Sequence, residues 1–306
     1  TYKAKGIIPD DDKLSLGAAG LSPLGDKNIN PIITAADLIL LVGYDPIEMR
    51  SGWRNLWDCS ENRVIEILIA PEYSYMHKSS ISFVCDIGEG IRALSEGVDT
   101  KTTWKNGELT EMLSRHATIY GQKQEWGPGA ITETVRELVP RDTIITMDSG
   151  AHRILISQAW PTYVPRSALQ SSAFCTMGCA LPLATGAKLA DPSRVVVAFM
   201  GDGGLEMVLG ELITLRDLAL PVIVIVFVDA SLALIEKKQR EMQYKNAGVD
   251  MNETDFKGIA LAAGGNGFVV QTRAQLTDAL NIALNTSEKF TLISCKIPRG
   301  SYDEII

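Results

Sequence analysis

Two apolar segments separated by one helical pattern constrain the fold of this chain more strongly than any other feature. The segments are residues 195–200 and 222–228, and residues 205–218 between them have the apolar spacing of a helix. This order predicts a βαβ unit with two parallel strands. The carboxyl ends of both strands are therefore expected at the same edge of one sheet, where open α/β sheets bind ligands.

An acidic side chain directly follows each of these strands. Asp202 stands in the glycine-rich segment 201–204, and Asp229 follows residue 228. Carboxylate oxygens are preferred ligands of Mg²⁺, which keeps waters and phosphate oxygens in its octahedral shell. We therefore expect Asp202 and Asp229 to hold one divalent cation together with a diphosphate. The alternative is that both carboxylates only cap the helices that follow the strands.

The remainder of the chain alternates between strand and helix patterns. Further strands are expected at 36–42, 63–69, 81–85, 143–147, 267–270 and 290–295. Further helices are expected at 88–94, 108–120, 130–139, 178–190, 255–263 and 274–284. The alternation predicts an α/β fold with a doubly wound parallel sheet. We place a first α/β domain at residues 1–100, a linker at 101–125 and a diphosphate-binding domain at 126–306.

The composition of the chain argues against several classes of partner. Of its 306 residues, 46% are hydrophobic and 22% are charged, which is ordinary for a soluble folded protein. The formal net charge of −8 argues against a nucleic-acid partner, and the apolar runs are too short to span a membrane. Because the five cysteines show no CxxC spacing, we expect free thiols and a cytoplasmic setting.

Other phosphate-binding motifs do not fit the segment that contains Asp202. The chain has no GxxxxGK[ST] string, and residues 201–206 break the GxGxxG pattern at the last position. A phosphatase of the haloacid dehalogenase type would need a second aspartate at the strand end, which this segment lacks. A diphosphate held through a metal ion remains the best interpretation.

The order of motifs around both aspartates resembles a known family. Gly201, Asp202 and Gly203, then Glu211 and Thr214, then Leu220 to Val222 and finally Asp229 are similar to the thiamine diphosphate motif, and the separation of the two aspartates matches the acetohydroxyacid synthase group. Residues 148–152 and 171–182 resemble the DxGxH and GTMGxxLP segments of this family. Residues 1–17, 36–45 and 64–86 resemble the later part of its central domain, so the first domain is expected to be a partial, Rossmann-like central domain.

This resemblance implies thiamine diphosphate and Mg²⁺ as cofactors and assigns roles to the motif residues. The metal would be held by Asp202, Asp229 and the backbone carbonyl at Ser231. The residues that would line the diphosphate are Gly150, Ala151, His152, Gly201, Gly203 and Gly204. The alternatives that need no cofactor are a tight turn with positive φ at Gly203 and Gly204, and a solvated or core position for His152.

The resemblance also assigns residues to the rings of the cofactor and to the substrate. Met177 would be an apolar wedge that bends the cofactor, which makes it the candidate catalytic residue, although a methionine in such a segment more often packs in a core. The backbone carbonyl of Cys175 would accept a hydrogen bond from the amino group of the cofactor. The residues expected beside the substrate pocket are Leu232, Ala233 and Leu234.

Four positions depart from the family pattern. The family often has glutamine where Ala151 stands and asparagine where Asp229 stands. Lys238 takes the place of a tryptophan and Leu234 that of a methionine in the biosynthetic enzymes. These departures leave the choice of substrate open.

The activity implied is decarboxylation and carboligation of a 2-oxo acid such as pyruvate by an acetolactate synthase-like transferase or lyase. The N-terminal pyrimidine-binding domain of the family, which carries an activating glutamate, would come from a missing part of the protein or from another chain. We therefore expect the isolated chain to be inactive and the complete protein to be a homodimer or homotetramer. The alternatives are a 2-oxo-acid decarboxylase or lyase of the same family, or a non-catalytic nucleotide-binding fragment. FAD is a further candidate cofactor for the central domain.

Overall fold

The chain folds into two compact units. The computed structural model describes the chain except for residues 47–52, 54, 62, 72, 74, 75, 102, 122–124 and 173, so four residues of the expected linker (102 and 122–124) lie outside the described residues. The larger unit comprises Thr1–Ala18 and Ala117–Ile306, and the smaller unit comprises Ala19–His116. The limits expected from the sequence place residues 1–18 in one domain with residues 19–100. These limits stay a prediction.

The first residues are tied to the larger unit through Asp10. Its carboxylate accepts hydrogen bonds from Lys5 Nζ at 2.7 Å and from the backbone N–H of Thr162 at 2.8 Å. Tyr2, in the short 3₁₀ helix η1 (Tyr2–Ala4), is buried. The buried Lys5–Asp10 pair therefore fixes this segment beside residues 162–164.

The smaller unit is built on a three-stranded parallel sheet in the order β1-β2-β3. The strands are β1 (Leu38–Val42), β2 (Arg63–Leu68) and β3 (Ile81–Val84). The helices are α1 (Pro23–Thr34), α2 (Ile87–Ser95) and α3 (Glu108–Tyr120), the last of which crosses the division between the units. Helix α1 was not predicted, although Ser22 caps it and a proline stands at its start. A second proline, Pro31, lies inside the helix, where proline is unfavourable, so the sequence of this segment does not indicate a helix.

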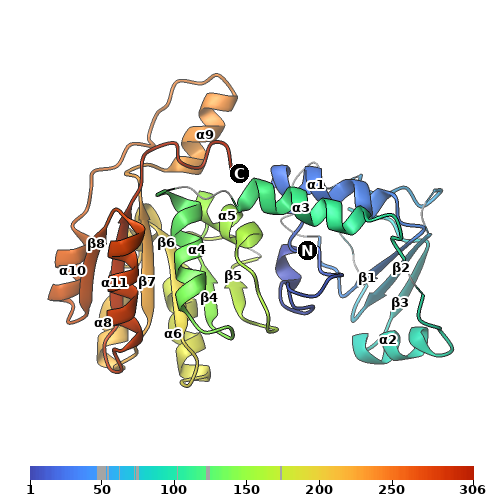
Figure 1. Ribbon diagram of the computed structural model, residues 1–306, viewed down its shortest axis with the longest axis horizontal. Coiled ribbons are helices and arrows are strands. Elements are labelled where there is room, and N and C mark those ends of the chain that lie inside the picture. Colours follow the sequence, from blue (N-terminus) through green and yellow to red (C-terminus); the bar gives the residue numbers. More distant parts are fainter. Residues whose placement is uncertain are drawn as a thin grey trace. The chain divides into compact units, whose positions relative to one another are not determined.

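The larger unit contains a six-stranded, all-parallel sheet in the order β5-β4-β6-β7-β9-β8 (Figure 1). Its strands are β4 (Ile144–Met147), β5 (Ala168–Gln170), β6 (Val196–Gly201), β7 (Ile223–Val228), β8 (Asn266–Val270) and β9 (Thr291–Lys296). Its helices are α4 (Pro128–Leu138), α5 (Ala151–Ala159), α6 (Ala180–Ala190), α7 (Asp202–Glu206), α8 (Glu211–Asp217), α9 (Ala233–Glu241), α10 (Phe256–Ala262) and α11 (Arg273–Leu284).

Helices cover both faces of this sheet, so the predicted doubly wound α/β fold is confirmed. Helices α4, α5 and α11 pack on one face, and Figure 1 shows α4 and α11 side by side there. Helices α6, α8 and α10 pack on the other face. Strand β7 sends Ile225 and Phe227 into the first core and Val224 and Val226 into the second. Burial on both faces explains its uninterrupted apolar sequence.

Several expected helices have different limits. The single helix predicted at 205–218 is two helices, α7 and α8, because the backbone between them turns through tighter i→i+3 hydrogen bonds such as Val208 N–H to the Leu205 carbonyl. Helix α6 begins at Ala180 rather than at Gly178, since Gly178 has a φ of 82°. Helices α5 and α9 and strand β5 were not predicted.

Two further features of the structure are the state of its cysteines and the length of its apolar helices. All five cysteines are free thiols, as expected. Among the described residues, no helix combines the length and the apolar character that crossing a membrane requires.

Candidate cofactor-binding site

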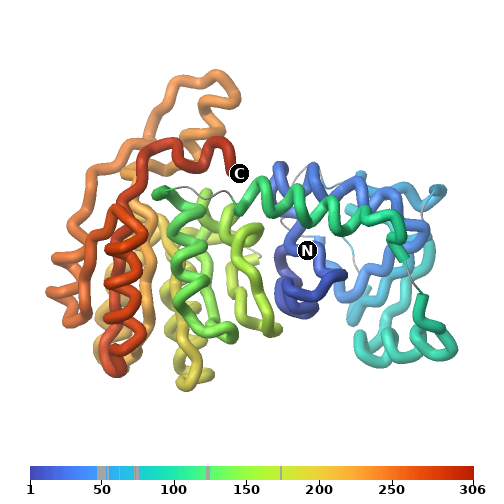
Figure 2. The backbone as a smooth tube through the Cα atoms, in the orientation of Figure 1, coloured from blue at the N-terminus to red at the C-terminus, as the bar shows by residue number. Residues whose placement is uncertain are grey.

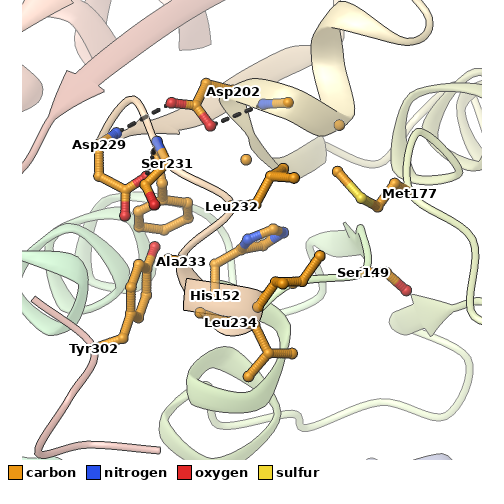
Figure 3. Close-up of a pocket in the computed structure, with 17 residues that line it drawn as sticks. Ser149, His152, Met177, Asp202, Asp229, Ser231, Leu232, Ala233, Leu234 and Tyr302 are labelled. Carbon is orange, nitrogen blue, oxygen red and sulfur yellow. Dashed lines mark hydrogen bonds between the residues drawn. The ribbon is translucent and has the colours of Figure 1, made fainter. Parts of the chain in front are cut away.

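The structure brings Asp202 and Asp229 together at one edge of the larger sheet. Strands β6 and β7 are parallel neighbours, with Gly201 opposite Phe227. The two aspartates therefore follow neighbouring strand ends. Asp202 Oδ2 accepts a hydrogen bond from the backbone N–H group of Asp229 at 3.2 Å (Figure 3). It also accepts one from the backbone N–H group of Ala230 at 2.8 Å.

Neither aspartate is a helix cap. The N-cap of α7 is Gly201, without a side-chain cap, and Asp202 is already inside that helix. The N-cap of α9 is Leu232, again without a side-chain cap. Asp229 instead accepts from the Ser231 backbone N–H through Oδ1 at 3.3 Å, and its buried Oδ2 has no hydrogen-bond partner among the described residues. The capping alternative is therefore wrong for both residues.

Burial and mutual repulsion destabilise the ionised forms of this pair. Burial is the main cause that raises the pKa of Asp202, while its hydrogen bonds from backbone N–H groups oppose the rise. Burial, and then the negative charge of Asp202, raise the pKa of Asp229 to about 7. Two close carboxylates of this kind favour a bound cation, which would offset both effects.

The donor set fits Mg²⁺ rather than an all-protein metal cage. Within the described part of the chain, no cluster of three or more His, Cys, Asp or Glu side chains has metal-binding geometry. Mg²⁺ is usually bound through one or two carboxylates together with phosphate oxygens and waters. The orphaned Asp229 Oδ2 beside Asp202 is compatible with such a site.

A cavity of about 160 Å³ opens beside the two aspartates. It is lined by every residue predicted to bind the cofactor except Cys175. Four lining residues were not predicted: Ser149, Phe227, Ile235 and Tyr302. Figure 3 shows side chains from several loops and helices directed toward this space.

His152 lies in the first turn of α5 and faces this cavity. Its ring stacks on Phe227 with centroids 5.6 Å apart. Its Nε2 is buried, and no described residue forms a hydrogen bond with it. Burial, helped by the neighbouring Arg153 charge, lowers its pKa to about 3, so the ring is neutral. The alternative of a solvated histidine is therefore wrong.

The glycines at this site let the backbone lie close to neighbouring side chains. Gly203 and Gly204 have no positive φ, so the interpretation as a left-handed turn is wrong. A Cβ on Gly204 would lie 1.9 Å from Asp148 Oδ2, which leaves no room for any larger residue. Gly150 has a φ of 154°, and a Cβ there would lie 2.8 Å from the His152 ring.

The loop that carries Met177 is fixed by Asp148. The Asp148 carboxylate accepts a hydrogen bond from the Cys179 backbone N–H at 2.9 Å, and Met177 lines the cavity. Cys175 does not line it; its φ is 54°, and its carbonyl accepts a hydrogen bond from the Ser149 hydroxyl. The carbonyl expected to meet the cofactor therefore already has a partner in this structure.

Comparisons with known proteins match both units of the chain. Residues 148–295 match the model of the thiamine pyrophosphate enzyme C-terminal TPP binding domain. Residues 1–94 match the model of the central domain of the same enzymes. The first match contains both aspartates, His152 and Met177.

Individual relatives are similar at 27 to 29% identity. An acetolactate synthase of Bacillus subtilis (strain 168) is 27% identical over 98% of this chain and 55% of its own length. A catabolic acetolactate synthase of Raoultella terrigena is 27% identical over 88% of this chain and 49% of its own. A pyruvate oxidase of Lactiplantibacillus plantarum is 29% identical over 92% of this chain and 47% of its own. The chain thus spans about half the length of these relatives, and it belongs to the thiamine pyrophosphate-dependent, acetolactate synthase-like enzyme family.

Proposed function

We propose that this chain supplies the Mg²⁺- and diphosphate-binding part of an enzyme that decarboxylates and ligates a 2-oxo acid such as pyruvate, in the manner of an acetolactate synthase. The observation that carries the proposal is the convergence of Asp202 and Asp229 at neighbouring strand ends, with Asp229 Oδ2 buried and without a partner. Two of the similar relatives are acetolactate synthases, which supports the reaction class.

In this proposal the two carboxylates and the backbone carbonyl of Ser231 hold Mg²⁺. Ala151 and His152 lie in the first turn of α5, where backbone N–H groups and the helix dipole favour an anionic diphosphate. Gly150 and Gly201 keep the backbone close to the His152 ring. Gly203 and Gly204 follow Asp202 in α7 and line the cavity beside it.

The remaining lining residues would position the rest of the cofactor and exclude water. When bound, thiamine diphosphate supplies a carbanion nucleophile and an electron sink for the loss of CO₂. Met177 would press on the cofactor and hold it bent, and the Cys175 carbonyl would accept from its amino group in place of Ser149. The apolar residues at the start of α9, Leu232, Ala233 and Leu234, would keep water from the reacting carbon.

In this proposal the full reaction also needs an activating glutamate that lies outside this chain. A pyrimidine-binding domain, from the rest of the protein or from another chain, would carry the activating glutamate, within a cytoplasmic homodimer or homotetramer. The isolated chain is then inactive. The similarity to a pyruvate oxidase favours a second candidate, a decarboxylase, lyase or oxidase of the same family with FAD as a further cofactor. A panel of 2-oxo acids assayed on the complete enzyme, with acetolactate and CO₂ as readouts, separates these reactions.

The binding site itself can be tested on this chain. Calorimetric titration with thiamine diphosphate should show binding that requires Mg²⁺. Asp202→Ala should weaken that binding at least about a hundredfold, because it removes a charged ligand from a partly buried site. Equal binding without Mg²⁺, or an unchanged affinity in the variant, would contradict the proposal.

A further inference from the structure

The segment that follows β9 forms one wall of the cavity. Tyr302 lies in this segment, is only 4% exposed and lines the cavity. Its ring packs edge-on against Phe227, with centroids 6.5 Å apart. A tyrosine placed in this way keeps its ring in the core and its hydroxyl at the edge of the polar site.

The hydroxyl of Tyr302 is directed toward the metal-binding loop. Figure 3 shows its oxygen pointing toward Asp229 and Ser231. No hydrogen bond of this hydroxyl is found among the described residues, so it is available to a ligand. A tyrosine hydroxyl keeps its proton at neutral pH, so it can act as a hydrogen-bond donor.

Ion pairs hold this segment against α9 in a fixed position. Arg240 donates to both carboxylate oxygens of Asp303 at 2.8 Å, and Lys237 Nζ donates to the Asp303 backbone carbonyl at 2.8 Å. Arg299 Nε donates to Glu236 at 2.8 Å, and the same carboxylate accepts from the Ser231 hydroxyl. Figure 2 shows the C-terminal end of the trace running back beside α9. Tyr302 is thus held in place before any ligand arrives.

An anionic ligand at this site needs hydrogen-bond donors for those phosphate oxygens that do not contact the metal. The cavity wall beside the cation contributes two carboxylates, which repel phosphate oxygens that the cation does not neutralise. A neutral hydroxyl donor satisfies such an oxygen without adding negative charge. Tyr302 presents this group on the same side as Asp229.

We propose that the Tyr302 hydroxyl donates a hydrogen bond to the diphosphate of the metal-bound ligand, so that the segment after β9 takes part in ligand binding. This inference rests on the proposed function, because it assumes that a diphosphate and a divalent cation occupy the cavity. The residues that position Tyr302 are Arg240 and Asp303, which fix its segment to α9.

The test uses Tyr302→Phe, which removes the hydroxyl and keeps the ring. Calorimetry measures the affinity for inorganic pyrophosphate with Mg²⁺ and for thiamine diphosphate with Mg²⁺. Loss of a hydrogen bond to a charged ligand should weaken both about tenfold to a hundredfold. The matched control is Tyr244→Phe, since Tyr244 is 62% exposed and lies outside the cavity lining; its affinities should not change.

The outcomes separate this inference from the proposed function. If the wild-type chain binds neither ligand with Mg²⁺, the proposed function fails, and this inference fails with it. If the wild type binds both and Tyr302→Phe binds them equally well, only the inference fails. A loss for thiamine diphosphate without a loss for pyrophosphate would place Tyr302 against another part of the ligand and overturn the assignment to the diphosphate.

A second variant tests the positioning role. Arg240→Gln breaks the contact with Asp303 outside the cavity and should weaken pyrophosphate binding several-fold. In a Tyr302→Phe background the same change should have no further effect, because the hydroxyl it positions is gone. An equal loss in both backgrounds would show that Arg240 does not act through Tyr302.

Discussion

The two units of this chain build parallel sheets from similar strands but bury them to different extents. All six residues of β7 and five of the six in β6 are buried in the larger unit. In the smaller unit all four residues of β3 are exposed, and α2, which follows it in the chain, has no buried residue. An aspartate follows a strand in both places, Asp202 after β6 and Asp86 after β3.

These two aspartates show that one sequence pattern gives two kinds of site. Asp86 is exposed and caps α2 by accepting from the Glu89 backbone N–H at 3.0 Å. Asp202 is buried and bonds to the loop of the next strand, which carries a second carboxylate. A strand followed by aspartate is therefore not enough to predict a buried pair of carboxylates. A buried neighbouring strand with its own acidic end is also required.

The largest expected difference between the units is in core stability. Phe199 is fully buried in β6, whereas Phe83 in β3 is 43% exposed. Phe199→Ala should lower the free energy of unfolding by about 3–5 kcal/mol, because it leaves a cavity in a packed core. Phe83→Ala should cost less than about 1 kcal/mol. Urea unfolding followed by circular dichroism measures both, and equal losses would break the comparison.

The glycines that follow each aspartate should respond to alanine substitution to different extents. Gly204→Ala should lower the free energy of unfolding by about 1–3 kcal/mol, because its Cβ would overlap the Asp148 carboxylate. Gly88, in the first turn of α2, would place a Cβ no closer than 3.3 Å to another atom. Because that atom is the Asp86 Oδ1 that caps α2, Gly88→Ala should change the free energy of unfolding by less than about 1 kcal/mol. Thermal unfolding of the two variants measures both changes in stability. Stabilisation by Gly204→Ala would contradict the close approach of Gly204 to the Asp148 carboxylate.

The affinity for Mg²⁺ should depend on pH through Asp229. The pKa of this carboxyl is raised to about 7, so below pH 7 it holds a proton that the cation must displace. The affinity should fall about tenfold per pH unit below pH 7 and level off above it. Titration of Mg²⁺ in the presence of pyrophosphate between pH 5.5 and 8.5 measures this.

Asp229→Asn is the control for the pH dependence. An asparagine keeps an oxygen ligand but has no proton to lose, so the slope between pH 5.5 and 7 should flatten in the variant. A slope that survives the substitution would assign the titrating proton to another group.

The smallest expected effect concerns the aspartate of the smaller unit. Asp86→Ala removes an N-cap and should lower the free energy of unfolding by about 1 kcal/mol. It should leave the affinity for Mg²⁺ and pyrophosphate unchanged, because Asp86 is absent from the cavity lining. A weaker affinity in this variant would mean that the smaller unit takes part in the site.

Much of the larger unit could be predicted from the sequence because its strands are apolar throughout. Strands β6 and β7 and the aspartates after them follow from local pattern and from the rule for parallel crossovers. Helix α5 was missed because its first residues were interpreted as a turn after β4. Helix α9 was missed because its residues 236–241 are charged or polar and show little apolar periodicity.

The part of the site that escaped prediction comes from segments without a regular pattern. Tyr302 lies in a turn after the last strand, far in sequence from the aspartates, and its position depends on ion pairs between Arg240 and Asp303. No periodicity marks such long-range contacts. The role of Gly204 was misjudged for a similar reason, since its constraint is the Asp148 carboxylate rather than its own backbone angle.

The central claim, that Asp202 and Asp229 share one ion, is tested most directly by a double-mutant cycle. Mn²⁺ affinity in the presence of pyrophosphate is measured by electron paramagnetic resonance for wild type, Asp202→Ala, Asp229→Ala and the double variant. If both carboxylates bind the same ion, the loss in the double variant should be smaller than the product of the two single losses, because either substitution already removes a ligand from the shared ion. Two bound Mn²⁺ ions per chain in the wild type, each lost in only one of the single variants, would contradict the account.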